Sequence, residues 1–515
     1  MTECASDPNL RALRIVDALL LVLVLAVALA VPLHLPPIAA HGESREGLVV
    51  QDVVERGNWV LPRRNGELPS KPPLFHWIAA GVARVCGLSD AVVRSPSAIA
   101  AGLMLLATAG LGAAIGGRAT GLLAAGALLG IHGFWESAWE ARVDMVFAAA
   151  ITLTLVAFFF WYRDRGRGAQ VCCYLGAAAG VLAKGPAGAV LPGLVMVAFI
   201  TRESWRASGT VSAASRPRAA LVEALATLGR LWSWPLVALV LALDLGWYAL
   251  AFARGGREFL ALQLVRENLD RVVGRGVFGL HGGRSHLKIV KHLVTDLVPW
   301  NLALAWAAIA WIRGARADLG ERFLHAWWLV VVVVFSAAYG KRDVYLLPAY
   351  PAIAVLAGLF MAAATVESST TRLFGVLPIP ERLRRRSGGR PALALLVVLI
   401  VCLDATVLTV GEVQRLHQVR KRSLLPFGRA VAETLPPDAV LYAQGDVDGS
   451  DVQVLAYRLH RAIAQVPSVP APDADPVASY YLVRAPADHA REAGLRVITE
   501  SARRGPNLAL VTVSR

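Results

Sequence analysis

Four short segments of the sequence place charged side chains beside glycine or proline, at the ends of apolar runs. They are residues 41–77, 139–145, 182–188 and 339–351. Ionisable groups at the end of a membrane-embedded helix are costly, so they usually serve a function or pair with one another. Carboxylates in such places can move protons, and lysine or arginine can bind an anion such as phosphate. The alternative for any one segment is simple anchoring of a helix end at a membrane surface.

Lysine is scarce in this chain, and its positions are therefore informative. Only six of the 52 basic residues are lysine, so arginine supplies the general positive charge. Lys71, Lys184 and Lys341 each lie in one of the four segments, and Arg342 follows the last of them. A compact ammonium group is a good point-charge partner for phosphate. The sequence therefore predicts that these cations bind a phosphate. The alternative is that the lysines lie on the outer side of a membrane simply because more of the loop residues are there.

The composition shows what kind of elements must position these residues. Of the 515 residues 56% are hydrophobic and only 17% are charged, with a mean hydropathy of +0.53. Soluble domains carry about 25% charged residues, so the composition excludes a soluble enzyme and predicts a polytopic membrane protein. The net charge of +15 then reflects loops near anionic lipid headgroups rather than nucleic-acid binding. The five cysteines show neither disulfide nor metal spacing.

Apolar runs long enough to span a membrane predict about eleven helices, with an uncertainty of two. If the N-terminus is inside, the basic residues of the cytoplasmic loops are all arginine, and the lysines and the C-terminal tail lie outside. The predicted spans are 15–33, 92–115, 119–133, 143–162, 170–184, 187–201, 233–253, 290–312, 324–339, 345–366 and 391–411.

Two regions outside the spans have structure of their own. The outer loop 34–91 contains a stretch from Glu43 to Arg56 with the pattern of an amphipathic surface helix. After residue 411 the composition becomes that of a soluble domain. We therefore predict a membrane domain over 1–411 and a small extracytoplasmic α/β domain over 412–515. Its expected strands are 440–442, 480–483 and 508–513, and its expected helices are 428–434 and 452–462.

The four segments together resemble the GT-C membrane glycosyltransferases, especially protein O-mannosyltransferases and bacterial lipid A aminoarabinose transferases. In that family an Asp-Glu pair after the first helix is followed by an amphipathic helix, a G-[DN]-W step and a KPP turn. Further motifs follow in a fixed order. The corresponding positions here are Glu43, Gly57-Asn58-Trp59, Lys71-Pro72-Pro73, Ala141 to Met145 (AR-x-D-M), Lys184 to Pro186 (KGP), LVPWNL at 297–302 and YLLPAYPA at 345–352.

The resemblance implies a mainly α fold, with about 11–13 membrane helices of GT-C type and an outer cavity. It implies inverting transfer of a sugar from a polyprenyl-phosphate donor to lipid A, another glycolipid, a polysaccharide or a protein. The reaction would occur on the outer face of a plasma membrane, among membrane lipids and without a cofactor. The implied substrate-binding residues are Lys71, Lys184, Lys341, Arg342 and Tyr345.

Three carboxylates are candidates for the catalytic groups. Glu43 keeps the family register and is the preferred general base, with Glu46 one helical turn on as its rival. The alternative for Glu43 is a surface ion pair with Arg45 or Arg56. Asp144 would order the acceptor or brace a cation, or alternatively cap a helix.

The sequence departs from the family pattern in two places. Gly42 stands where the family has the Asp of its Asp-Glu pair. Aminoarabinose transferases also have a metal held by a Glu and a His, whose positions here are Ser70 and Asn268, so we expect no metal site. The alternative functions are a catalytically inactive relative or a transporter that binds a lipid-linked sugar, although no inverted repeat supports a transporter.

Overall fold

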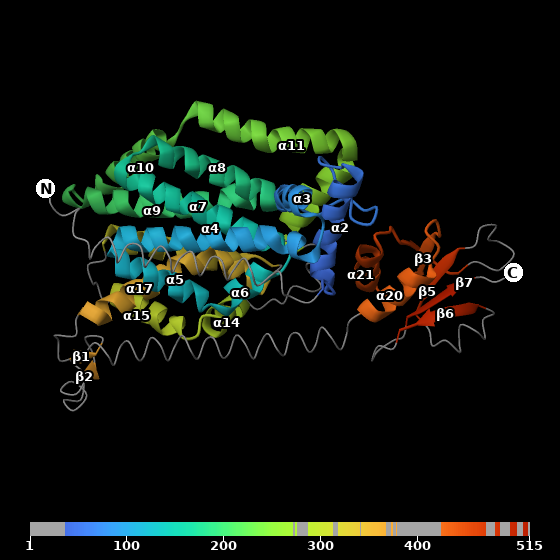
Figure 1. Cartoon of the computed structure of the whole chain (residues 1–515). Coiled ribbons are helices and arrows are strands. Elements are labelled where there is room, and N and C mark those ends of the chain that lie inside the picture. The colour runs from blue at the N-terminus through green and yellow to red at the C-terminus, as the bar shows by residue number, and fades with distance from the viewer. Residues whose placement is uncertain are drawn as a thin grey trace. The chain divides into compact units, whose positions relative to one another are not determined.

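The computed structural model describes residues 37–270, 273–274, 287–312, 318–339, 341–366, 372–373, 377–378, 424–469, 479–484, 495–501 and 508–512 (Figure 1). The chain forms two compact units, which are described separately. The first comprises Met1–Leu33, Ser70–Leu74 and Pro96–Val407, and the second comprises His34–Pro69, Phe75–Ser95 and Leu408–Arg515. The predicted boundary at 411/412 lies outside the described residues and stays a prediction.

The first unit is helical and apolar, which confirms the predicted fold class. Among the described residues, 6 helical stretches are long and apolar enough to cross a membrane: Asp90–Gly116, Val143–Asp164, Ala187–Thr210, Trp234–Asp270, Leu319–Ala337 and Val344–Ala362. The protein is therefore an integral membrane protein. The predicted spans 15–33 and 391–411 lie outside the described residues, so the total number of spans stays a prediction.

Most helices of this unit lie at the predicted spans, with short helices in several of the connections. In chain order they are α4 (Asp90–Gly116), α5 (Arg118–Leu129), α6 (His132–Trp139), α7 (Val143–Asp164), α8 (Arg167–Lys184), α9 (Ala187–Ala207), η1 (Ser208–Thr210), α10 (Arg216–Leu231), α11 (Trp234–Leu260), η2 (Ala261–Asp270), α14 (Leu287–Thr295), α15 (Trp300–Ile312), α16 (Leu319–Ala337), η3 (Asp343–Ala349) and α17 (Tyr350–Val366). The prediction of one span over 290–312 is wrong, because the helix is interrupted between Thr295 and Trp300.

Helix α7 forms the centre of the membrane unit. In the most apolar 18-residue stretch of this helix 89% of the residues are buried, compared with 17% in the corresponding stretch of Trp234–Asp270. It packs against α8 and α9, while α11 lies at the margin of the layer of helices (Figure 1). Phe158, Phe199 and Phe323 pack ring to ring, with centroids 5.2–6.2 Å apart. Among the six candidate spans of the described residues, the helix that carries Asp144 is therefore the most deeply buried.

Part of the predicted outer loop forms the second unit together with the C-terminal residues. The loop supplies α2 (His41–Arg56) and most of α3 (Leu74–Cys86). Helix α2 covers the predicted stretch, but its buried residues include Glu43, Glu46, Gln51 and Asp52 as well as valines. Burying so many polar groups is costly unless each has a partner. The partners of these side chains therefore define what α2 does.

The C-terminal part contains a five-stranded mixed sheet, as the predicted α/β composition implied. Its strand order is β4-β3-β5-β7-β6, with β3 parallel to β4 and β5 and β7 antiparallel to β5 and β6. The elements are α20 (Leu425–Thr434), β3 (Leu441–Gln444), α21 (Gly449–Leu459), β4 (Ala464–Val466), β5 (Tyr480–Val483), β6 (Arg496–Glu500) and β7 (Ala509–Thr512). The sequence analysis missed β4 and β6, because both are edge strands that contain no fully buried residue and lack an apolar alternation.

Candidate active site

The predicted residues Asp144, Lys184 and Tyr345 come together in the membrane unit. Asp144 is the second residue of α7 and Lys184 is the last residue of α8. The Lys184 ammonium donates a hydrogen bond to Oδ1 of Asp144, and the side chains are 14% and 7% exposed. Its Nζ also lies 4.9 Å from the ring centroids of both Phe147 and Tyr345. This ammonium is therefore fixed by one carboxylate and two aromatic faces.

Local sequence explains why Lys184 ends its helix at this position. The following residue, Gly185, has a backbone φ of +89°, which residues other than glycine rarely adopt. Three residues on, a Cβ at Gly188 would lie 2.0 Å from the carbonyl carbon of Gly180. Glycine is therefore required for the close approach of α8 and α9. The KGP motif is thus a tight connection that presents Lys184 at the end of α8.

Arg342 acts on the same carboxylate. The charges of Arg342 and Arg142 both contribute to the electrostatic environment of Asp144, after that of Lys184. The N-cap position of α7 is Arg142, and no side chain caps the helix. The hydrogen bond of Asp144 to Lys184 is therefore different from the capping role that the sequence left open. Asp144 is the negative centre of a group that carries more positive than negative charge.

Lys341 and Lys71 occupy other parts of the same unit. Lys341 is 7% exposed, and its carbonyl accepts a hydrogen bond of 3.4 Å from Lys288. Lys71 pairs with Glu267 in η2, with Nζ 2.5 Å from Oε2. Both of these side chains are 11–13% exposed. The sequence analysis did not assign Glu267 a role, although it named the neighbouring Asn268.

The region around Glu267 is also close to the KGP connection. Asn268 donates a hydrogen bond of 2.6 Å to the carbonyl of Gln263. A Cβ built on Gly185 would lie 3.3 Å from the Asn268 amide nitrogen. Asn268, where the resemblance implies a histidine, therefore lies beside the turn that begins after Lys184. The segment Glu267–Asn268 thus contacts both turns: Glu267 pairs with Lys71 of the KPP turn, and Asn268 lies beside Gly185 of the KGP turn.

In the second unit, Glu43 forms a buried ion pair with Arg94 on α4. Oε1 accepts from Nε at 2.7 Å and Oε2 accepts from Nη2 at 2.9 Å. The two residues are 3% and 2% exposed. The pair is therefore bidentate, and it is not the surface pair with Arg45 or Arg56 considered above. A general base at Glu43 requires Arg94 to release one carboxylate oxygen to the acceptor hydroxyl.

Glu46, the rival base, is held by two other partners. Its Oε1 accepts from Arg45 at 2.7 Å, and its Oε2 lies 2.9 Å from Nε2 of His76. Burial by itself raises the pKa of the Glu46 carboxyl, but Arg45 and the hydrogen bond from His76 together hold that pKa well below its usual range. Glu46 is therefore ionised throughout the physiological pH range. His76 is 1% exposed, and its burial is explained by its contact with the buried Glu46 carboxylate.

The described residues contain no cluster of three or more His, Cys, Asp or Glu side chains that could hold a metal ion. The positions at which the resemblance implies metal ligands are Ser70 and Asn268. The residues next to them, Lys71 and Glu267, pair with each other, so a metal ion would compete with the Lys71 ammonium for the Glu267 carboxylate. The expected independence of metal stays a prediction.

We expect transfer activity to be retained in excess EDTA, because fixed cations take the place that a metal has in many nucleotide-sugar enzymes. The measurement is the initial rate of the purified protein in detergent or nanodiscs, before and after chelation. Addition of zinc or magnesium should leave that rate unchanged. Loss of activity in the chelator, followed by recovery with either metal, would show that the prediction is wrong.

The fold and these clusters define a class of protein: a helical integral membrane protein with a cation-rich cluster at the end of α8. Residues 70–248 match the family described as dolichyl-phosphate-mannose-protein mannosyltransferase. The structure is similar to that of ArnT from Cupriavidus metallidurans bound to undecaprenyl phosphate, with a TM-score of 0.75 at 19% identity, covering 96% of this chain and 98% of that one. This likeness establishes the fold, and it confirms the predicted resemblance.

Comparison of sequences also finds relatives of this kind. The chain is 25% identical over 334 residues to an undecaprenyl phosphate-alpha-4-amino-4-deoxy-L-arabinose arabinosyl transferase from Shewanella sediminis, covering 63% of this chain and 56% of that protein. It is 24% identical over 322 residues to an uncharacterised protein from Aquifex aeolicus, covering 62% of this chain and 58% of that protein. The chain thus spans less than two thirds of the length of these relatives.

Proposed function

We propose that this protein transfers a sugar from a polyprenyl-phosphate donor to an acceptor hydroxyl at the outer face of a plasma membrane. The observation that carries the proposal is the Lys184 ammonium, fixed between Asp144 and two aromatic rings in an apolar helical unit. A lipid-linked donor needs apolar helices for its prenyl tail and fixed cations for its phosphate. The relative from Shewanella sediminis, whose name includes undecaprenyl phosphate, supports this donor class.

In the proposed reaction the acceptor oxygen attacks the anomeric carbon of the donor sugar. The bond from that carbon to the phosphate oxygen breaks, the configuration inverts, and the electron pair leaves with the lipid phosphate. Lys184 would stabilise the negative charge that develops on this phosphate, supported by Lys71, Lys341 and Arg342. Tyr345 would hold the Lys184 ammonium and contact the donor. The acceptor proton would pass to a carboxylate.

We assign the proton-accepting role to Glu43 and a bracing role to Asp144. Asp144 neutralises part of the Lys184 charge and fixes its direction, which keeps the ammonium oriented in the absence of donor. Glu43 is the proposed base, and Arg94 orients its carboxylate through two hydrogen bonds. Glu46 is the alternative base, although its partners Arg45 and His76 keep it strongly ionised, which weakens it as a proton acceptor.

The outer-face topology and an extracytoplasmic C-terminal part belong to the same proposal. The distribution of arginine and lysine in the predicted loops supports them. The acceptor would be lipid A, another glycolipid, a polysaccharide or a protein. Since the relative from Shewanella sediminis is named for aminoarabinose transfer, a lipid A-type glycolipid is the first acceptor to test.

The test is a transfer assay with the full chain in nanodiscs. The donor is a radiolabelled undecaprenyl-phosphate pentose or hexose, and the acceptors are lipid A, a polysaccharide preparation and membrane proteins. Expected is a labelled, acceptor-dependent product that is lost in the Lys184→Ala variant. If no donor and acceptor combination gives product while the donor still binds, the transferase proposal fails.

One observation favours a second candidate, a donor-binding relative without turnover. Gly42 stands in the position where the family has an aspartate, so one carboxylate of its Asp-Glu pair is missing. This candidate predicts saturable binding of the labelled donor and no transfer to any acceptor. Introducing the missing carboxylate as Gly42→Asp would then be expected to create activity, whereas an active natural protein should gain little from it.

A further inference from the structure

Two consecutive residues of the C-terminal part, Tyr457 and Arg458, bind the segments that hold Glu43. Both lie in the last turn of α21. The Tyr457 hydroxyl donates to Oδ1 of Asp90 at 2.8 Å. Arg458 donates through Nη2 to Oδ2 of Asp90 at 2.8 Å and through Nε to the carbonyl of Ile38 at 2.9 Å. We refer to Tyr457 and Arg458 as the latch.

Asp90 connects the latch to the candidate base. Its Oδ2 also accepts from the backbone N–H of Ile38 at 3.0 Å, so both polar groups of that peptide residue are bound. Ile38 lies three residues before α2, which carries Glu43. Asp90 is the first residue of α4, and Arg94 lies one turn further on the same helix. The latch therefore fixes the starts of the two helices that carry Glu43 and Arg94.

Tyr457 also packs directly on α2, one turn after Glu43. A Cβ at Gly47 would lie 2.5 Å from Cε2 of Tyr457, so only glycine leaves room for the ring at this position. Tyr457 is 4% exposed. Burial and the neighbouring Asp90 carboxylate raise the pKa of Tyr457, so its hydroxyl keeps the proton that it donates. Steric fit and hydrogen bonding thus act at the same contact.

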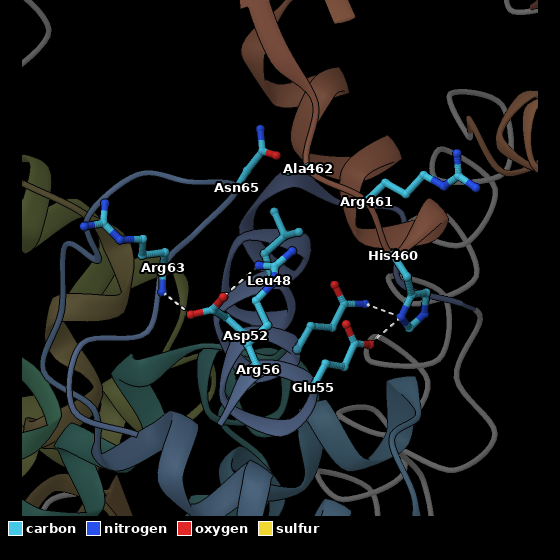
Figure 2. A pocket seen from close by; sticks show the side chains of 10 residues that line it. Leu48, Asp52, Glu55, Arg56, Arg63, Asn65, His460, Arg461 and Ala462 are labelled. Carbon is cyan, nitrogen blue, oxygen red and sulfur yellow. Dashed lines mark hydrogen bonds and ion pairs between the residues drawn. The ribbon is translucent and has the colours of Figure 1, made fainter. Parts of the chain in front are cut away.

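A second row of contacts extends the attachment along α2 (Figure 2). Gln51 donates to the carbonyl of Tyr457 at 3.0 Å, and Glu55 lies 2.7 Å from Nδ1 of His460. Asn65 binds both the N–H and the carbonyl of Ile463, at 2.8 Å and 2.9 Å. These contacts fix the residues after α21 against α2 and the loop that follows it. The latch is therefore part of an extended attachment and is not an isolated contact.

We propose that Tyr457 and Arg458 are positioning residues, which keep the Glu43 carboxylate in place through Asp90 and Arg94. The inference rests on the proposed function, in which Glu43 accepts the proton of the acceptor. Without the latch, Asp90 loses two of its donors while its charge still acts on Arg94. Asp90 would then compete with Glu43 for the guanidinium group. A displacement of about 1 Å at a catalytic group can cost about 100-fold in rate.

The test compares Tyr457→Phe, which removes only the hydroxyl, with Tyr442→Phe, which changes a tyrosine of the same sheet domain that stacks on Tyr481. We expect Tyr457→Phe to lower kcat about tenfold with the donor KM changed less than twofold, and Tyr442→Phe to change neither. Hydrogen exchange of the amides of residues 41–47 should become faster in Tyr457→Phe only. Arg458→Gln should resemble Tyr457→Phe.

A double-mutant cycle tests whether the effect passes through Glu43. If it does, Tyr457→Phe causes no further loss in the residual turnover of Glu43→Gln. A full additional tenfold loss in that background, unchanged kcat of the single variant, or unchanged hydrogen exchange would each overturn the proposal. If the natural protein shows no transfer, the proposed function fails, and the hydrogen exchange of residues 41–47 still decides whether the latch positions α2.

Discussion

Lys184→Ala is expected to weaken binding of the polyprenyl-phosphate donor by about 1–3 kcal/mol, the scale for loss of a hydrogen bond to a charged group. This corresponds to roughly 5- to 150-fold in affinity. Turnover should fall at least as much, because the same ammonium would stabilise the departing phosphate. Binding is measured with labelled donor in nanodiscs, and turnover is measured under saturating donor.

The structure also predicts a complication for this variant. Removal of Lys184 leaves the Asp144 carboxylate, whose side chain is 7% exposed, without this hydrogen-bond donor. Removing one partner of a buried ion pair costs about 3–5 kcal/mol of folding free energy. A loss of donor binding could therefore reflect partial unfolding. The double variant Lys184→Ala with Asp144→Asn removes both charges and serves as the matched control.

The two variants together separate stability from donor binding. We expect the double variant to recover most of the thermal stability that Lys184→Ala loses, but none of the donor affinity. If the double variant recovers donor affinity as well, Lys184 only compensates Asp144, and the phosphate role is wrong. Asp144→Asn alone should retain donor binding with reduced turnover, because Lys184 keeps its charge but loses its orientation. Full turnover of that variant would contradict the bracing role of Asp144.

The membrane fold could be predicted from the sequence because the governing signal is local. A run of about 20 apolar residues is sufficient to identify a span, and α4, α7 and α11 were located on that basis. The Lys184 position was also predictable, because Gly185 and Pro186 mark the end of α8 in the sequence itself. In the sheet domain the same approach found the central strands β3, β5 and β7 and missed the edge strands β4 and β6.

The pairings of the charged residues could not be predicted in the same way. Glu43 and Arg94 are 51 residues apart, Lys71 and Glu267 are 196 apart, and Tyr457 and Asp90 are 367 apart. No periodicity encodes such contacts, since they depend on how distant segments pack. The sequence analysis therefore preferred Glu43 as the base but considered only Arg45 and Arg56 as its ion-pair partners, and it found no role for the C-terminal residues. Buried carboxylates on α2 required partners that only the fold supplies.

Glu43→Gln is expected to reduce turnover at least 100-fold, since removal of a general base typically costs 10²–10⁴ in rate. Donor binding should be unchanged. Glu46→Gln should lose less, because Glu46 is strongly ionised by Arg45 and His76 and is therefore the weaker base. Turnover, donor affinity and thermal stability are measured for both variants, so that a folding defect is recognised.

The pair with Arg94 determines how this comparison is interpreted. A glutamine at position 43 can accept one of the two hydrogen bonds from Arg94 through its amide oxygen, but Arg94 then loses the charge of its bidentate partner. Glu46→Gln makes the same change of charge against Arg45 and His76, one turn away on α2. Both variants should therefore lose some stability, and only Glu43→Gln should lose turnover beyond that loss. The opposite order would move the base to Glu46, and full activity in both would show that α2 supplies no base, leaving Arg94 and Glu43 with a purely structural function.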